Sequence, residues 1–424
     1  MRLIFSSVML AAILILASAC AEADNPTPTA TIPGGQNPTA TPTHTAPPPT
    51  PTNLEIALGR VPVEYRDKRL VFGDYGLARS LIGADETSLI TLVELQKLVE
   101  SYEEQDGKHE PFMGIFSPLA FFRVFGSFYL ELGLEEILHA GGLTGVGIYY
   151  PIPGRDSPTF LSLETTFQRD PVIAKLLESG SEEAEYRGVT YYTRNEDYIG
   201  SLEDPLTRFG PILNRVAFND DLFLAAPATS VMTSLIDVEQ GTASSLADSR
   251  AHKALAQAVG SDLVAGMFWP FTWLNSDWVP RNIADYRGSV IMDGPGRWES
   301  LSVYEVVLSG YRVREGVDEI VSALFYPDPE AAEGDAAELK HRWETYVVPG
   351  SSEGPQLVQG CAPLTTRVIK GDDFSVLEAS CPVIWHPSQR YHPFQSSLLW
   401  QTLTPDIFTQ DIAKLKKAVA SGQE

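Results

Sequence analysis

A stretch rich in proline and threonine, residues 21–53, limits what this chain can fold into. It holds 9 Pro and 9 Thr and almost no large apolar side chain. Because proline fixes φ and lacks an amide donor, and because nothing in the stretch can fill a core, we expect extended backbone there. The sequence therefore predicts a tether, with a short leader before it and a folded body after it.

The leader has the pattern of a secretory signal. Arg2 precedes an uncharged apolar run, residues 3–16, which is too short to span a bilayer comfortably but typical of a cleavable signal. The following residues, Leu16-Ala17-Ser18-Ala19-Cys20, resemble the bacterial lipobox. We expect a signal peptide over residues 1–19, a lipid on Cys20 and a lipid-anchored tether over residues 20–53. The alternative is ordinary cleavage that leaves Cys20 free.

Charge excludes some partners. The 424 residues include 31 Lys+Arg and 55 Asp+Glu, a formal net charge of −24. Only Arg2, Glu22 and Asp24 precede residue 54, so the acidity belongs to the body. Such a body is repelled by nucleic acid and by anionic lipid headgroups, so we expect the membrane to be reached only through Cys20. An acidic exterior mainly serves to keep a protein soluble, and we interpret the charge in this way. The alternative interpretation is an acidic face that binds a partner.

The body is expected to be α+β, with largely antiparallel sheets, packing helices and two related halves. Its length favours two units, residues 54–210 and 211–424. Residues 216–226 predict a hairpin turning at Asn219-Asp220, and residues 317–326 predict a strand. Apolar side chains at helical spacing predict a helix over residues 332–346. Residues 69–82 and 221–236 are faintly similar, and each predicts a strand followed by a helix. This similarity indicates that the two halves arose by duplication.

Cys361 and Cys381 are the other two cysteines. In an oxidising compartment we expect them to form a disulfide. Residues 364–369 and 374–380 are strand-like and flank a turn, and opposed cysteines would centre the pairing on Gly371. Two buried free thiols are the alternative.

No catalytic or cofactor motif stands out. The patterns G-x-S-x-G, S-x-x-K, H-E-x-x-H and C-x-x-C are absent, so we expect no cofactor, no metal and no catalytic residues. An aromatic run offers candidate ligand-binding residues, because planar rings stack on sugars. These are Trp269, Trp273 and Trp278, although a buried core strand explains them better.

Several short motifs resemble a family of uncharacterised bacterial lipoproteins that carry a domain of unknown function. The motif YRGVTYY, residues 186–192, is one of them, and the others occupy residues 218–227, 230–236, 244–248, 251–255 and 331–343. The resemblance covers roughly residues 60–345, and the order of the motifs is its specific part. It implies an extracytoplasmic, tethered body and brings no catalytic residues.

These patterns together favour a membrane-anchored lipoprotein of unknown activity on the extracytoplasmic side. We expect a non-enzymatic body that binds or scaffolds an envelope protein or a glycan. A solute- or glycan-binding lipoprotein with an aromatic cleft is the alternative, and an envelope hydrolase is less favoured.

Overall fold

The computed structural model divides the chain into two units, Met1–Pro49 and Thr50–Glu424. It describes residues 50–74, 76–77, 144–148, 160–164, 169–204, 206–207, 211–219, 222–270, 301–345, 361 and 363–383. All of these residues belong to the second unit. Cys20, most of the predicted tether, Trp273 and Trp278 lie outside them.

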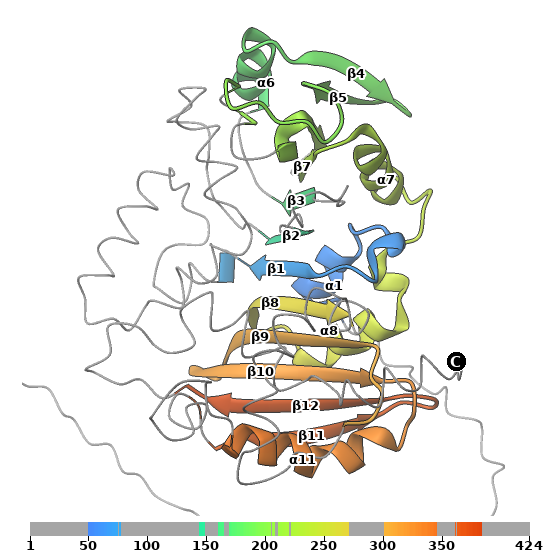
Figure 1. The fold of residues 1–424 in the computed structure, drawn as a ribbon, viewed down its shortest axis with the longest axis vertical. Coiled ribbons are helices and arrows are strands. Elements are labelled where there is room, and N and C mark those ends of the chain that lie inside the picture. Colours follow the sequence, from blue (N-terminus) through green and yellow to red (C-terminus); the bar gives the residue numbers. More distant parts are fainter. Residues whose placement is uncertain are drawn as a thin grey trace, which may run out of the picture. The chain divides into compact units, whose positions relative to one another are not determined.

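Twelve strands form one antiparallel sheet in the order β11-β12-β10-β9-β8-β1-β2-β3-β7-β6-β5-β4 (Figure 1). The strands of the first part of the chain are β1 (Leu70–Asp74), β2 (Thr144–Ile148), β3 (Phe160–Glu164), β4 (Glu182–Tyr186), β5 (Val189–Thr193), β6 (Arg215–Asn219) and β7 (Leu222–Ala226). The later strands are β8 (Leu263–Pro270), β9 (Val306–Arg314), β10 (Val317–Tyr326), β11 (Thr365–Lys370) and β12 (Ser375–Pro382). Sheet and helices together confirm the predicted α+β class with antiparallel pairing.

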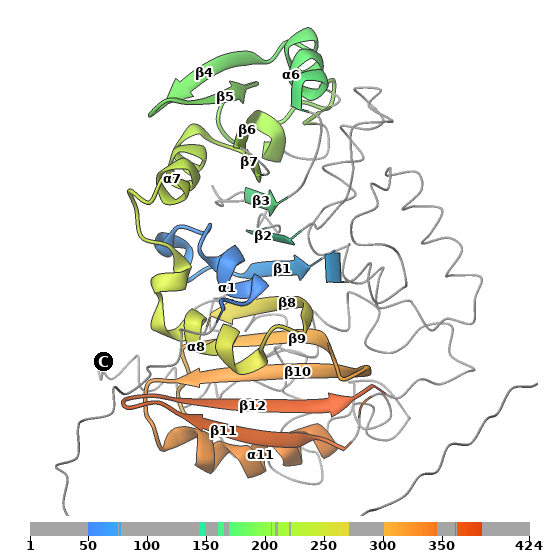
Figure 2. The same ribbon diagram turned by 180° about the vertical axis from the view of Figure 1, so that it is seen from behind.

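Helices cover both faces of the sheet (Figures 1 and 2). They are α1 (Asn53–Leu58), α6 (Arg169–Glu178), α7 (Thr229–Glu239), α8 (Arg250–Val259) and α11 (Ala331–Thr345), with 3-10 turns at Val63–Tyr65, Pro211–Asn214 and Leu246–Asp248. Apolar residues of α1, α7 and α8 share one core with Phe72, Phe268 and Phe325. None of the described helices has the length and apolar character needed to cross a bilayer.

Helix α11 packs on the opposite face of the sheet. The backbone N–H of its Ala332 donates to the Oγ of Ser375, which lies opposite Tyr326 of β10, whereas Phe325, the neighbour of Tyr326, belongs to the core beneath α8. Because successive side chains of a strand point to opposite faces, α8 and α11 lie on either side of β10. Double coverage explains why residues 320–326 are all buried and, apart from Ser322, apolar.

The sheet is built from two related halves that meet at β1 and β8. Each half begins with this central strand and adds two neighbours, β2 and β3 or β9 and β10. A helix follows, α6 or α11, and a later hairpin, β6–β7 or β11–β12, returns with its last strand to pair with the strand before the helix. In the first half the β4–β5 hairpin lies between the helix and that hairpin. The structure thus matches β1 with β8, whereas the sequence similarity between residues 69–82 and 221–236 matches β1 with β7. The segments predicted as separate units share this sheet, since β5 pairs with β6 and β3 with β7.

Local predictions were accurate to within a residue or two. The hairpin at residues 216–226 is β6–β7, with Asn219 opposite Leu222. Strand β10 spans the predicted residues, and α11 spans Ala331–Thr345. The last predicted helix residue, Tyr346, lies outside the described residues.

The C-terminal hairpin carries the expected disulfide. Cys361 and Cys381 are bonded, with Cα atoms 5.4 Å apart. The predicted register was wrong, because Lys370 pairs with Ser375 and the turn centres beyond Gly371. Cys381 lies opposite Ile320 of β10, and Cys361 bridges to Val383 before β11 begins. The disulfide therefore links β12 to the segment that precedes the edge strand β11.

Candidate functional site

The most elaborate polar arrangement among the described residues surrounds the loop after β5, residues 194–207. Strands β4 and β5 form a tight hairpin in which Arg187 has φ 49° and Gly188 has φ 80°. Positive φ at both central residues is typical of the turn that matches the twist of a hairpin. Residues Tyr186–Val189 therefore form a turn that leads into strand β5. Strand β5 then delivers Arg194 to the start of the loop.

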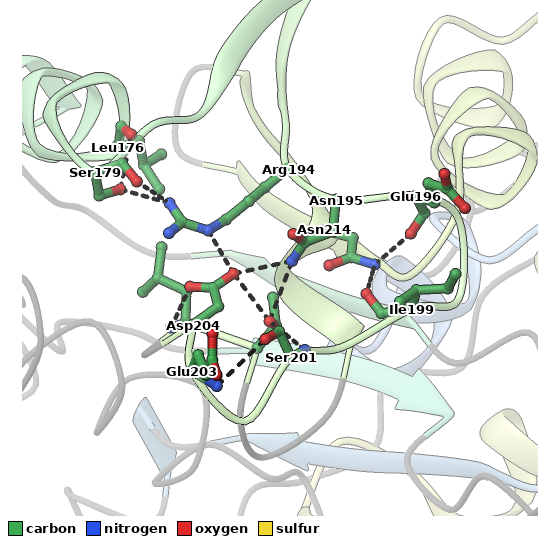
Figure 3. A network of polar contacts seen from close by, with 12 residues as sticks. Leu176, Ser179, Arg194, Asn195, Glu196, Ile199, Ser201, Glu203, Asp204 and Asn214 are labelled. Carbon is green, nitrogen blue, oxygen red and sulfur yellow. Dashed lines mark hydrogen bonds and ion pairs between the residues drawn. The ribbon is translucent and has the colours of Figure 1, made fainter.

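Arg194 joins three segments of the chain (Figure 3). Its Nη1 donates to the carbonyl oxygen of Ser179, 2.6 Å away, and to the Ser179 Oγ at 2.8 Å. Its Nε donates to Asp204 Oδ2 at 2.6 Å. Asp204 also accepts from Asn195 and Thr207. The end of α6 and both ends of the loop are thus held by one guanidinium group.

Burial by itself raises the pKa of the Asp204 carboxyl, but hydrogen bonds from Arg194, Asn195 and Thr207 outweigh burial and hold that pKa below its ordinary value. The carboxylate form is therefore the form that ties the loop together.

A second set of bonds holds the middle of the loop to Asn214 and Arg215 and to the start of α7. Asn214 Nδ2 donates to the carbonyl oxygens of Glu196 and Ile199, each at 2.9 Å. Asp197 Oδ1 accepts from the backbone N–H of Thr229 at 2.9 Å and from Arg215 Nη2 at 2.5 Å. An acceptor at this point satisfies an amide in the first turn of α7. The loop is fastened at both ends and at its centre.

The fastened loop presents apolar side chains to solvent. Leu202 is 87% exposed and Ile199 is 52% exposed. Leu177, at the end of α6 beside the Ser179 bonds, is 40% exposed. Large apolar side chains on a rigid loop are typical of contact surfaces, because little conformational entropy is lost when a partner covers them.

A different polar cluster lies at the C-terminal end of α8 and has a structural explanation. Arg312 of β9 and Arg367 of β11 donate to the carbonyl oxygens of Val259 and Ala258. Both arginines form ion pairs with Glu378 of β12, and Arg312 also pairs with Glu319. Cations near the last carbonyls of a helix favour its dipole. This cluster connects α8 to four strands, β9, β10, β11 and β12.

His252 of α8 is a further buried polar residue. Its Nδ1 lies 2.9 Å from Ser249 Oγ, and its ring packs against Phe268. Among the described residues its Nε2 finds no hydrogen-bond partner. Burial lowers the pKa of His252 to about 4, so the imidazole is neutral near pH 7. Ser249 and His252 lack a third orienting group among the described residues, so this pair is not interpreted as catalytic.

The predicted site residues are only partly described by the structure. Trp269 of β8 is 2% exposed, and Arg69 lies 5.1 Å from its ring centre. Its ring is part of the interior, as the core interpretation expects, and not a surface for stacking a ligand. Trp273, Trp278 and Cys20 lie outside the described residues, where the aromatic cleft and the lipid anchor stay predictions. Within the described ranges no group of three or more His, Cys, Asp or Glu side chains could hold a metal ion.

Sequence reasoning missed the loop after β5. The sequence does contain weak signals, because Asp197, Asp204 and Asn214 are residue types that bond to backbone in turns. The structure adds that Asn195 and Tyr198 adopt positive φ. Their partners, however, are up to 32 positions away, beyond the reach of local patterns.

Comparisons with known proteins add little. No protein-family model matches the chain, and no curated protein matches its sequence. The structure is similar to crystal form I of TP0453, with a TM-score of 0.33 and 7% identity over 83% of this chain and 98% of that chain. Crystal form III of TP0453 gives a TM-score of 0.32 and 9% identity over 81% and 98%. Likeness at this level supports no conclusion about fold or function.

Proposed function

We propose that this chain is an exported lipoprotein, anchored through Cys20 on the extracytoplasmic side of the membrane, whose body binds another envelope component without catalysing a reaction. The observation that carries the export is the Cys361–Cys381 disulfide, because such bonds persist in oxidising compartments. It agrees with the apolar leader, the lipobox-like residues and the proline-rich tether. The binding role rests on the fastened loop after β5 with its exposed Ile199 and Leu202.

The anchor is tested by the Cys20→Ser substitution in cells that process lipoproteins. Stable attachment needs more than one acyl chain, and the substitution removes the thiol that begins the lipid modification. We expect the variant to move from the membrane fraction to the soluble extracytoplasmic fraction, as followed by immunoblot. Incorporation of an alkyne-labelled fatty acid should be lost with it.

The matched control is the double variant Cys361→Ser with Cys381→Ser, which retains Cys20 and should stay in the membrane fraction. Wild-type chain recovered from the cytosol with its thiols reduced would overturn the proposal. Continued membrane retention of the Cys20→Ser variant would overturn the lipid anchor.

A further inference from the structure

One end of the sheet combines an open strand edge with exposed apolar side chains. Strand β4 is the last strand of the sheet, and its start lies beside the loop after β5, since Glu182 pairs with Thr193. Arg194 binds both Ser179 and Asp204, which brings the end of α6 to the same place. We call this region, comprising Leu177, Glu182, Glu183, Leu202 and Glu203, the β4-end surface.

The charge of this region is uncompensated. Glu182, Glu183 and Glu185 of β4 and Glu196 and Glu203 of the loop are all exposed, and none forms an ion pair with another described residue. The opposite edge of the sheet differs, because Arg367 and Lys370 of β11 pair with Glu378 and with Glu330 and Glu333. Helix α11 also packs against β11. Five exposed glutamates without an ion pair among the described residues favour a cationic partner.

The β4–β5 hairpin is also the part of the sheet that the two halves do not share. Seven strands, β1 to β7, make up one half of the strand order and five, β8 to β12, the other. The other five strands of the longer half, in the order β1-β2-β3-β7-β6, match the order β8-β9-β10-β12-β11 of the shorter half. The hairpin and its fastened loop are therefore an addition to the strand order that the halves share, although Tyr191 of β5 packs into the common core.

We propose that the β4-end surface binds a cationic, extended segment of an envelope protein, which adds as a strand to β4 and covers Leu202. Main-chain bonds to an open edge supply affinity, and alternate side chains supply specificity. This inference rests on the proposed binding function and names its partner class. Two chains cannot readily pair through β4, because glutamates would face glutamates. The same charge disfavours contact with an anionic bilayer.

The test uses the detergent-solubilised full chain and a fluorescein-labelled peptide of alternating lysine and valine, with fluorescence anisotropy at about 150 mM salt, where exposed charges act over about 8 Å. We expect saturable binding to wild type and increased hydrogen-exchange protection of residues 182–186. The double variant Leu202→Ser with Glu203→Lys should weaken binding at least about tenfold, because it removes an apolar contact and reverses a charge.

The matched control is Glu315→Lys with Val317→Ser. It makes the same change in charge and polarity at an exposed glutamate and an exposed apolar residue of the β9–β10 turn, and it should bind as wild type does. Equal weakening by both double variants would show attraction to the acidic body as a whole and overturn the proposal. So would absence of peptide binding, or binding only to vesicles containing phosphatidylglycerol. Any of these results, with the chain still in the membrane fraction through Cys20, would leave the proposed anchoring intact.

Discussion

Arg312 is fully buried in β9, yet it is surrounded by charged and polar partners. Its guanidinium lies 2.6 Å from Glu319 and 2.9 Å from Glu378, and it donates to the carbonyl of Val259. Removing one member of a buried ion pair leaves an uncompensated charge. We therefore expect Arg312→Met to lower the free energy of unfolding by about 3 kcal/mol or more, measured by urea denaturation.

Arg314, two residues further along β9, provides the control for that measurement. It is 38% exposed in its side chain and makes only long contacts, 3.9 Å from Asp262 and 4.0 Å from Glu378. Exposed pairs contribute about 1 kcal/mol or less, so Arg314→Met should change stability little. Equal losses for the two variants would contradict the importance assigned to burial of Arg312.

His252 gives the protein a pH dependence of known sign. Its pKa is lowered to about 4 in the folded chain, below the ordinary value near 6.5. Below that ordinary value the unfolded chain takes up a proton that the folded chain does not. The free energy of unfolding should therefore fall by about 3 kcal/mol between about pH 6.5 and pH 4 from this residue alone.

The His252 contribution is isolated by comparing wild type with His252→Leu at several pH values, using denaturant titrations. The variant should lack this part of the slope. Ser249→Ala removes the hydroxyl near Nδ1 but keeps the imidazole, so its slope should resemble that of wild type. A wild-type slope in His252→Leu would show that another group is responsible.

At the scale of elements, the loop after β5 depends on Arg194. Replacement by Met removes the bonds to Ser179 and Asp204, and each lost hydrogen bond to a charged group costs about 1.5–3 kcal/mol. We expect faster hydrogen exchange and faster proteolysis across residues 195–207. Arg187→Met, at the exposed hairpin turn where Arg187 pairs with Asp237, should leave the exchange of this loop unchanged. If it does not, the loop is held by the hairpin and not by Arg194.

The disulfide should stabilise the C-terminal hairpin by limiting the number of conformations that the unfolded chain can adopt. Its sequence separation is 20, and a closed loop of that length corresponds to about 3 kcal/mol by chain entropy. Reduction of wild type should therefore lower the unfolding midpoint, and the Cys361→Ala, Cys381→Ala double variant should match the reduced protein. A midpoint indifferent to reductant would contradict this contribution.

Elements with a local signature were predictable, and pairings between distant segments were not. The β6–β7 hairpin and β10 follow from turn residues and apolar runs, and α11 from its spacing. Asp335 and Arg342 of α11 are nevertheless buried, because Ser302 and Glu338 supply their partners. Glu338 lies one helical turn before Arg342, but Ser302 is 33 residues from Asp335 and becomes a visible partner only after the sheet is assembled. For the same reason the sequence alone could not reveal the loop network around Arg194.

At the scale of the whole molecule, short sequence correspondences agree with the strand order. Residues 70–73, LVFG in β1, correspond to residues 263–266, LVAG in β8. Residues 215–221 and 367–373 share an Arg-Val start and an Asp-Asp end. The registers agree as well, since Arg215 pairs with Ala226 and Arg367 pairs with Glu378. Each of these paired positions is shifted by the same number of residues between the halves, as expected of a duplicated hairpin.

The pairing of β1 with β8, which we call the central seam, makes the two halves of the sheet depend on each other. Strand β1 pairs with β2 on one side and β8 on the other, and Phe72 belongs to a core that runs from Leu224 of β7 to Val376 of β12. Because neither half can withdraw from β1 without exposing this core, we expect one cooperative transition in calorimetry. Two separate transitions would show that the halves fold independently.

Phe72→Ala tests that coupling directly. Loss of a buried phenylalanine costs about 3–5 kcal/mol, and Phe72 lies opposite Val146 and Gly266 at the junction of the halves. Hydrogen exchange measured by mass spectrometry should report the same loss of protection in β6–β7 and in β10–β12. The exposed Val303 provides a control, since Val303→Ala should leave both regions unchanged. Loss of protection confined to one half would mean that the seam transmits no stability between them.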